Sequence, residues 1–303
     1  MPEKYVIIGV IGLLNLEYYG LFETESPFDF KKHSSIGSGG SAEVAFYPKN
    51  TEECCRLADL LREDGVAYTL VGNLTNCLPA ERVKRSLICT KKMTELRLLR
   101  DGRVFAEAGV SSGKLLSFAR NENLGGAEFL AGVPCTLGGA LYMNAGVRGK
   151  YIAEITERVL VYRKGKKIEL SVAECAYAYK RSLFMQTEDI ILGATLRLEK
   201  SERATILQKE KEYLQKRAHL PKGKSMGCVF KNPNGISAGE LIENAGLKGK
   251  KIGGAYISEE HANFIINGGT ATSQNIRDLI ILIKETVLQK SGVLLEEEIC
   301  YLG

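Results

Sequence analysis

One cysteine lies in a segment whose residue types could support chemistry. In "SMGCVFKNP" (225–233), Cys228 stands between the small Gly227 and a run that is first apolar and then basic. Its thiol is either a reacting group or one more small buried side chain. A buried structural role is the more common one, because free cysteine is among the most buried residue types. The segment alone leaves the choice open.

Three consecutive carboxylates lie near the end of the sequence, in "LEEEIC" (295–300). In a strand, alternation would place Glu296 and Glu298 on one face and Glu297 on the other. A charge run of this kind is usually a solvated strand end. One acid aimed into a site would nevertheless suit acid–base chemistry.

Two glycine-rich stretches in the first half of the chain are candidates for holding a phosphate. The first, "HSSIGSGGSAEVAFYP" (33–48), contains Gly37-x-Gly39-x-x-Ala42. A dinucleotide-binding fingerprint needs a strand before it and a helix after it. Here a polar segment precedes and a strand-like segment follows, which argues against a Rossmann domain. The second, "VGNLTNCL" (71–78), is a strand followed by a polar turn.

A third stretch, "AGVPCTLGGALYMNAG" (131–146), is the most informative. We expect its glycines to leave backbone N–H groups open to an anion, and two polar side chains to add hydrogen bonds. These residues are Gly132, Gly138, Gly139 and Gly146, with Thr136 and Asn144. For any one loop, tight turns and close packing explain the glycines better. Three such loops together favour a bound nucleotide.

Length and composition describe an ordinary globular protein. The chain has 303 residues, 45% of them hydrophobic and 25% charged, which is enough for two or three domains. A net charge of +5 fits an anionic small-molecule ligand. No dense Lys/Arg stripe with interleaved aromatics is visible, so we expect no nucleic-acid partner.

The cysteines and the N-terminus bear on the compartment. The eight cysteines form no CxxC pair and only three histidines accompany them, so we expect neither a metal site nor disulfides, and a cytoplasmic location. The apolar run "VIIGVIGLL" (6–14) is too short to span a bilayer. We expect a buried strand or helix there rather than a signal peptide, and no membrane partner.

Helix and strand patterns alternate irregularly along the chain. Apolar spacing predicts helices over 51–65, 111–125, 201–219 and 273–290, and strands over 66–72, 86–90, 103–109, 189–200, 253–258 and 293–303. A hairpin over 158–170 turns at Lys164-Gly165, and Ser237 with Glu240 forms a capping box. Antiparallel hairpins indicate an α+β fold rather than a doubly wound one. We predict an N-terminal segment 1–30 and domains 31–200 and 201–303.

The motifs, taken in order, resemble one family. The chain is similar to UDP-N-acetylenolpyruvoylglucosamine reductases, in the shorter subtype that lacks a tyrosine loop over the substrate. The similarity runs from His33 onward and rests on "HSSIGSGGSA", "GNLTN", "GVPCTLGGALYMNAG", "YKRSLF" (179–184), "SMGCVFKNP", 237–267 and 295–303. Each motif alone is moderate support, and the ordered set is strong.

The resemblance implies a fold, a cofactor and a reaction. It implies a two-part FAD-binding domain of the vanillyl-alcohol-oxidase (PCMH) type in 31–200, followed by a smaller α+β substrate-binding domain in 201–303. FAD, the co-substrate NADPH and a UDP-sugar would be its ligands, in peptidoglycan precursor synthesis. The expected cofactor-binding residues are Gly39, Gly40, Gly72, Asn73, Thr75, Asn76, Gly132, Thr136, Gly138, Gly139 and Asn144.

The resemblance also assigns three catalytic positions. Cys228 stands where relatives usually carry the serine that donates a proton, and a thiol, with a pKa near ~8.5, is a stronger acid than a hydroxyl. Glu298 occupies the family's carboxylate position. Lys180 replaces the family's arginine, which keeps the charge but loses the bidentate fork. In an extended segment, Arg181 would point the other way.

Some residues differ from those that the family usually has, and they leave other functions open. Leu74 and Cys135 stand where the family commonly has glycine, and both would thicken walls near the flavin phosphates. With Lys180, they leave room for a flavoprotein of the same fold that acts on another substrate, or for a non-catalytic nucleotide-binding relative. We expect a monomer or a weak homo-oligomer.

Overall fold

The chain crosses repeatedly between two units, each with a hydrophobic core of its own. A computed structural model describes residues 5–7, 13–15 and 17–303. Unit 1 comprises Met1–Ser26, Val44–Asn73 and Arg85–Ala218, and unit 2 comprises Pro27–Glu43, Leu74–Lys84 and His219–Gly303. The first two glycine loops are therefore cut between the units rather than kept in one domain.

A small mixed sheet forms one end of unit 1. Its strand order is β3 (Thr24–Glu25), β6 (Ala45–Phe46), β10 (Ser86–Cys89) and β7 (Tyr68–Val71), with β10 parallel to both β6 and β7. The helix α3 (Thr51–Glu63) begins where the Asn50 side chain accepts the Glu53 N–H, and Gly65 follows with a φ of +65°. On its apolar face, Leu57 and Leu61 are fully buried, as the spacing predicts, and Leu60 is partly buried.

A five-stranded antiparallel sheet forms the centre of unit 1. It is built in the order β11 (Leu96–Leu98), β12 (Val104–Glu107), β18 (Ile190–Leu196), β16 (Thr156–Arg163) and β17 (Lys166–Ser171). The predicted turn at Lys164-Gly165 has φ of +48° and +82°, as a two-residue hairpin turn requires. All seven residues of β18 are buried, and α4 (Ser112–Asn121) and α5 (Leu137–Met143) supply apolar side chains to the same core.

Short elements complete unit 1. They are α1 (Glu17–Leu21), α6 (Ile152–Ile155) and the strand pairs β1 (Tyr5–Ile7) with β2 (Leu13–Asn15), β13 (Leu124–Gly125) with β19 (Glu199–Lys200), and β14 (Gly146–Val147) with β15 (Lys150–Tyr151). The predicted apolar N-terminal element thus has its two ends in β1 and β2. Residues 8–12 between them lie outside the described residues.

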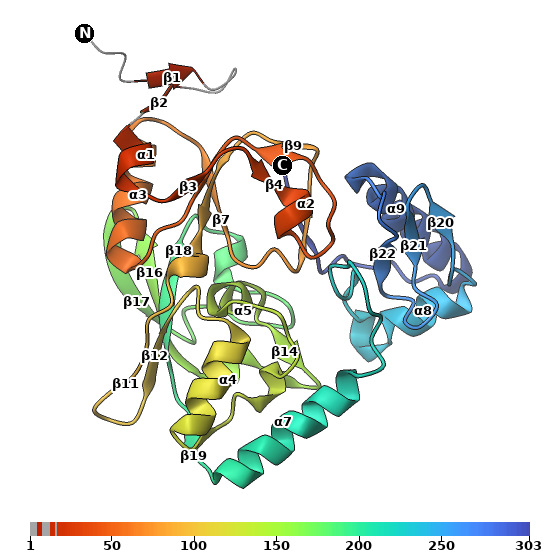
Figure 1. The fold of residues 1–303 in the computed structure, drawn as a ribbon. Coiled ribbons are helices and arrows are strands. Elements are labelled where there is room, and N and C mark those ends of the chain that lie inside the picture. Colours follow the sequence, from red (N-terminus) through yellow and green to blue (C-terminus); the bar gives the residue numbers. More distant parts are fainter. Residues whose placement is uncertain (1–4, 8–12, 16) are drawn as a thin grey trace. The chain divides into compact units, whose positions relative to one another are not determined.

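The charged helix α7 (Arg203–Arg217) belongs to unit 1. It lies beside α4 (Figure 1), where Glu210 pairs with Arg120 at 2.6 Å. The predicted boundary at 200/201 therefore falls inside this unit, which extends to Ala218. The functional division into 31–200 and 201–303 remains a prediction.

Unit 2 collects segments from three parts of the chain. The strands β20 (Lys251–Ile252), β21 (Ala255–Ile257) and β22 (Ile265–Asn267) pair antiparallel, and α9 (Ser273–Ser291) packs on β20 and β21 (Figure 1). The helices α8 (Ala238–Asn244) and α2 (Phe30–His33) and the sheet β4 (Phe28–Asp29), β5 (Ser41–Ala42) and β9 (Arg82–Val83) belong here too. Ile36 and Leu78 enter the same core as α8 and α9.

The predicted terminal strand over 293–303 is wrong for most of its length. Only β23 (Cys300–Leu302) is a regular strand, and it pairs in parallel with β8 (Cys77–Pro79). Before it, the segment touches residues 229–231 through isolated backbone hydrogen bonds. Because the segment changes partner at Cys300, neither ladder grows long enough to become a continuous strand.

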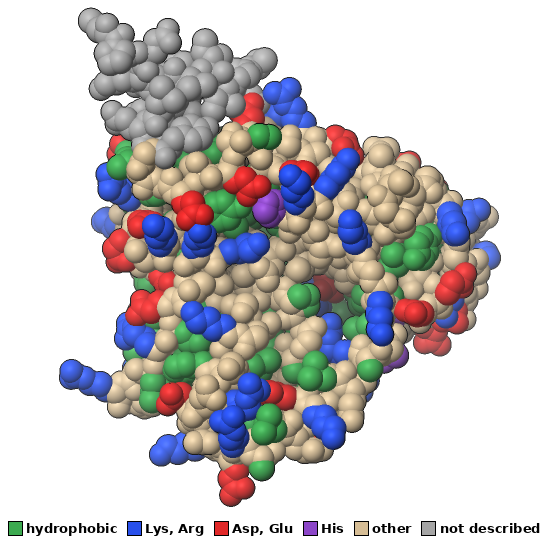
Figure 2. Space-filling model, in the orientation of Figure 1, with side chains coloured by type: hydrophobic (Ala, Val, Ile, Leu, Met, Phe, Trp, Pro, Cys, Tyr) green, Lys and Arg blue, Asp and Glu red, His purple; other side chains and the backbone are tan. Residues whose placement is uncertain are grey.

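The fold is α+β, as predicted, with antiparallel pairing dominant and helices on several sheets. No helix in the described part of the chain is long and apolar enough to cross a membrane. On the face drawn in Figure 2, Lys and Arg side chains are interspersed with Asp and Glu rather than gathered into one stripe.

Gly40 provides a test of the close approach between the chain segments of unit 2. A Cβ added there would lie 1.7 Å from the Glu81 carbonyl oxygen, whereas one at Gly113 in α4 meets nothing within 4 Å. We expect Gly40→Ala to lower the free energy of unfolding by about 1–3 kcal/mol or more. Gly113→Ala should raise it by up to about 1 kcal/mol. Urea denaturation measures both, and an unaffected Gly40→Ala protein would contradict the described approach.

Candidate active site

The segment 228–231, which carries Cys228 and lies outside the regular strands, is hydrogen-bonded on two sides within unit 2. On one edge, the Val229 N–H donates to the Asn263 carbonyl at 2.9 Å, and Cys228 forms a bridge with Phe264. On the other edge, the Val229 carbonyl accepts the Glu298 N–H at 2.8 Å. Val229 and Phe230 are buried while Cys228 is only half-buried. The side chain of Cys228 is therefore more exposed than those of the two residues that follow it.

Glu298 is held next to this segment by a residue of the second glycine loop. The Asn76 side-chain Nδ2 donates to the Glu298 carbonyl at 3.1 Å, and the Asn76 carbonyl accepts the Cys300 N–H at 2.9 Å. Burial raises the pKa of the Cys300 thiol, and the charge of Glu298 raises it further. The structure thus brings together the backbones of three predicted site residues, Asn76, Cys228 and Glu298. The positioning role of Asn76 was not part of the sequence-based prediction.

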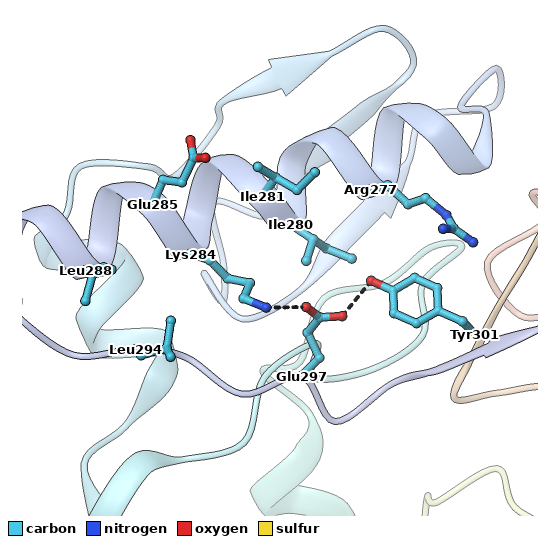
Figure 3. A pocket seen from close by; sticks show the side chains of 9 residues that line it. All are labelled: Arg277, Ile280, Ile281, Lys284, Glu285, Leu288, Leu294, Glu297 and Tyr301. Atoms are coloured by element: carbon cyan, nitrogen blue, oxygen red, sulfur yellow. Dashed lines mark hydrogen bonds and ion pairs between the residues drawn. The ribbon is translucent and has the colours of Figure 1, made fainter.

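The two other acids of the terminal run have different partners. Glu296 pairs with Lys231 at 2.6 Å. Glu297 accepts hydrogen bonds from Lys284 Nζ at 2.7 Å and from the Tyr301 hydroxyl at 2.6 Å (Figure 3). It lines a groove of about 360 Å³ along α9, whose walls also include Ile281, Leu288 and Leu294. None of the predicted catalytic or cofactor-binding residues lines this groove.

The glycines of the first loop are explained by close packing inside unit 2. The Gly40 N–H donates to the Ala80 carbonyl at 3.1 Å, and the Glu81 carbonyl leaves no room for a Cβ. Gly39 has a φ of +97°, and a Cβ there would lie 2.8 Å from the Pro79 side chain. Both positions therefore need glycine whether or not a ligand binds.

The second loop presents backbone N–H groups that the protein does not use. Among the described residues, no acceptor is found for the N–H groups of Leu74, Thr75 and Asn76. Leu74 has a φ of +52°, although its side chain is buried. Successive N–H groups around a left-handed residue form a concavity that suits an anion. The same φ gives a physical reason why glycine suits this position better than leucine.

The third loop, in unit 1, differs from the expectation. Thr136 is the N-cap of α5, and its Oγ1 accepts the Gly139 N–H at 3.3 Å. The Gly138 N–H donates to the Ala108 carbonyl at 2.8 Å. The prediction that Gly138 and Gly139 leave N–H groups open was wrong, because capping and packing on β12 use them. Gly72 also packs here, since a Cβ would lie 2.4 Å from Thr136 Oγ1.

The remaining predicted residues of unit 1 lie in or beside this loop. Gly132 has a φ of +75°, and a Cβ there would lie 3.3 Å from the Arg217 Nε atom. The Asn73 side chain donates to the Pro134 carbonyl at 3.3 Å. Cys135 is half-buried, and burial raises the pKa of its thiol to about 11.

Lys180 lies in a tight turn attached to the end of α5. The N–H and carbonyl groups of Ala178 and Arg181 are hydrogen-bonded to each other at 3.1 Å, and Lys180 between them has a φ of +53°. The Asn144 side chain donates to the Ala178 carbonyl at 2.8 Å. The segment is therefore not extended, and Asn144 serves to hold the turn that carries Lys180.

The candidate residues are divided between the two units. Unit 2 contains Cys228, Glu298, Gly39, Gly40, Thr75 and Asn76, and unit 1 contains Lys180, Gly72, Asn73, Gly132, Thr136, Gly138, Gly139 and Asn144. Within the described residues, no group of three or more His, Cys, Asp or Glu side chains could hold a metal ion.

Comparison with known proteins gives consistent matches over most of the chain. Residues 218–302 match the C-terminal domain of UDP-N-acetylenolpyruvoylglucosamine reductase, and residues 42–170 match an FAD binding domain family. The UDP-N-acetylenolpyruvoylglucosamine reductase of Geobacter metallireducens is 38% identical over 90% of this chain and 91% of its own length. That of Pelobacter propionicus is 33% identical over 97% of this chain and 99% of its own.

A solved structure agrees with these sequence matches. The crystal structure of UDP-N-acetylenolpyruvylglucosamine reductase from Thermus caldophilus covers 93% of this chain and 99% of its own, with a TM-score of 0.80 and 31% sequence identity. The predicted α+β fold with an FAD-binding domain is thereby confirmed.

Leu74 allows a test of the left-handed backbone in the second loop. Leu74→Ala and Leu74→Gly both remove a buried side chain, which we expect to destabilise the protein by about 2–5 kcal/mol in the alanine variant. Only glycine also relieves the positive φ, so it should be the more stable variant by about 1–2 kcal/mol. Thermal or urea unfolding compares the two. An alanine variant at least as stable as the glycine variant would contradict the described backbone.

Proposed function

Because this chain belongs to the UDP-N-acetylenolpyruvoylglucosamine reductase family, we propose that it reduces UDP-N-acetylglucosamine enolpyruvate to UDP-N-acetylmuramate. FAD is the proposed resident cofactor and NADPH the source of the hydride. The observation that carries the proposal is the hydrogen-bonded pairing of the Cys228 segment with the Glu298 segment in unit 2. It brings residues that carry a thiol and a carboxyl group onto neighbouring backbone segments, and either group could serve as a proton donor to a carbon.

The second glycine loop fits a diphosphate-containing cofactor better than the other two glycine loops do. The N–H groups of Leu74, Thr75 and Asn76 have no acceptor among the described residues, so they are available to phosphate oxygens. Gly39, Gly72, Asn73 and Gly132 are also proposed as cofactor-binding residues. Gly40, Gly138, Gly139, Thr136 and Asn144 would act by shaping the loops. The chemistry that FAD supplies when bound is transfer of a hydride from NADPH to the substrate.

Cys228 is proposed to supply the proton that completes the reduction. A hydride added to one carbon of the enolpyruvyl double bond leaves an electron pair on the other carbon, next to the carboxylate. The S–H bond then breaks as the new C–H bond forms, and solvent returns a proton to the thiolate. Free thiols have a pKa near ~8.5, far below that of a hydroxyl, so sulfur can do this at neutral pH.

Glu298 and Lys180 are proposed to assist this step. Glu298, whose N–H is bonded to the residue after Cys228, would take part in the same proton transfer. Lys180 would offset negative charge on the substrate carboxylate. Its single ammonium cannot form the two parallel hydrogen bonds of an arginine.

The proposed reaction belongs to peptidoglycan precursor synthesis, and through it to cell-wall formation, cell shape and division. We propose a cytoplasmic enzyme. The proposal is supported by the cysteine pattern of the sequence, in which eight cysteines form no CxxC pair.

The function is tested by following the flavin spectrum. We expect the purified protein to be yellow, to bleach with NADPH, and to regain the oxidised spectrum without oxygen when UDP-N-acetylglucosamine enolpyruvate is added. Bleaching without reoxidation by this substrate would indicate a flavoprotein that acts on another substrate. Failure to take up FAD would indicate a non-catalytic relative, and either result would overturn the proposal.

Adjacent glutamates provide a matched pair of variants. Glu298→Gln removes the proposed acid–base group, so reoxidation by the UDP-sugar should slow by about 100-fold or more, with bleaching by NADPH retained. Glu297→Gln alters the contacts to Lys284 and Tyr301, so we expect a loss of about 1 kcal/mol in stability and unchanged reoxidation. Stopped-flow absorbance measures both reactions. Equal effects of the two substitutions would refute a special role for Glu298.

A further inference from the structure

Asn263 is a buried polar residue that forms hydrogen bonds with one side of the segment that carries Cys228. Only 3% of it is exposed. Its side-chain Oδ1 accepts the Phe230 N–H at 2.9 Å, and its Nδ2 donates to the Phe230 carbonyl at 2.8 Å. Its own carbonyl accepts the Val229 N–H at 2.9 Å. One residue therefore fixes two consecutive residues of the segment, directly after the thiol.

The amide side chain takes the place of a missing strand neighbour. In an antiparallel ladder, the N–H and carbonyl of one residue point to the same neighbouring strand. For Phe230 that neighbour is absent, because the chain turns between His261 and Phe264, where the Phe264 N–H donates to the His261 carbonyl at 3.0 Å. A planar amide offers one acceptor and one donor, which match both groups. Neither a carboxylate nor a hydroxyl of ordinary geometry can satisfy both.

The turn that carries Asn263 is itself fixed. The Ser258 N–H donates to the Phe264 carbonyl at 2.9 Å, and the Ser258 hydroxyl accepts the N–H groups of Glu260 and His261. The Asn263 N–H donates to His261 Nδ1 at 3.3 Å. Burial lowers the pKa of His261, which keeps the ring neutral and this nitrogen an acceptor. Asn263 thus connects a rigid turn to the segment that carries Cys228.

On the opposite side, the segment is held by backbone hydrogen bonds and by the ion pair of Lys231 with Glu296. The Glu298 N–H and the Glu296 carbonyl bond to Val229 and Lys231, respectively. Those bonds come from a segment without regular strand structure before Cys300. The side chain of Asn263 is the contact that bonds both backbone groups of Phe230, two residues after Cys228.

We propose that Asn263 is a positioning residue for proton transfer by Cys228. The inference rests on the proposed function and adds to it a residue that does not touch the substrate. Reactions between held groups lose rate steeply when the geometry slips, by about 100-fold for a shift near 1 Å. Removing the amide frees the backbone of Phe230 and lets the thiol move.

The test compares single and double variants in the two half-reactions of the intact, FAD-loaded protein. Asn263→Ala should slow reoxidation at saturating UDP-sugar by about 100-fold, with bleaching by NADPH and half-saturation by UDP-sugar little changed. In a Cys228→Ala background, the same substitution should add no further loss of rate, because both substitutions disable the same proton transfer. Asn263→Asp, which keeps an oxygen in the place of Oδ1 for the Phe230 N–H but loses the donor to the Phe230 carbonyl, serves if the alanine variant does not fold, and should also slow reoxidation selectively.

Thr272→Ala is the control for general destabilisation of unit 2. It removes the N-cap of α9 and leaves the bonds of Phe230 intact, so we expect lower stability with unchanged reoxidation. Losses from Asn263 and Cys228 substitutions that multiply would overturn the positioning role, as would equal slowing of both half-reactions. If the wild-type protein is not reoxidised by the UDP-sugar, the proposed function fails and the inference falls with it. If Cys228→Ala reoxidises normally, the function stands but the role of Cys228 fails, and so does the positioning role of Asn263.

Discussion

The hydrogen bonds that hold the segment around Cys228 are the constraint on which the rest of the proposed site depends. Val229 is bonded to Asn263 on one edge and to Glu298 on the other, so the thiol and the carboxylate have backbones fixed to one another. Asn76 then ties the Glu298 segment to the second glycine loop. These residues are far apart in the sequence. They lie together because unit 2 is assembled from three chain segments with a common core.

Glycine has two different uses in the three loops. Gly40 and Gly138 are required because a neighbouring chain segment lies against them, and their N–H groups are already bonded. In the second loop, by contrast, the N–H groups of Leu74 to Asn76 have no acceptor among the described residues. Anion binding follows from unused donors rather than from the presence of glycine. We therefore propose that the backbone contacts to the cofactor phosphates lie near Asn76.

Local chemistry made part of the structure predictable from the sequence. Asn50, Ser111 and Ser237 cap helices, and Lys164-Gly165 turns a hairpin, because each acts on residues within a few positions. Motif order identified the family and both candidate catalytic residues of unit 2. Contacts between distant segments were not predictable from such patterns. The partner change at Cys300, the positioning by Asn263 and the tight turn at Lys180 all depend on which segments meet, and spacing does not record this.

The central claim is that the thiol of Cys228 protonates the substrate, in a place where relatives usually carry serine. The most direct measurement is the rate of anaerobic flavin reoxidation by UDP-N-acetylglucosamine enolpyruvate in Cys228→Ser and Cys228→Ala proteins, each first reduced with NADPH. We predict that serine retains reoxidation, while alanine loses about 100-fold or more. Both variants should bleach normally with NADPH. An alanine protein that reoxidises as fast as the serine protein would contradict the claim, because no side-chain proton donor would then be needed at this position.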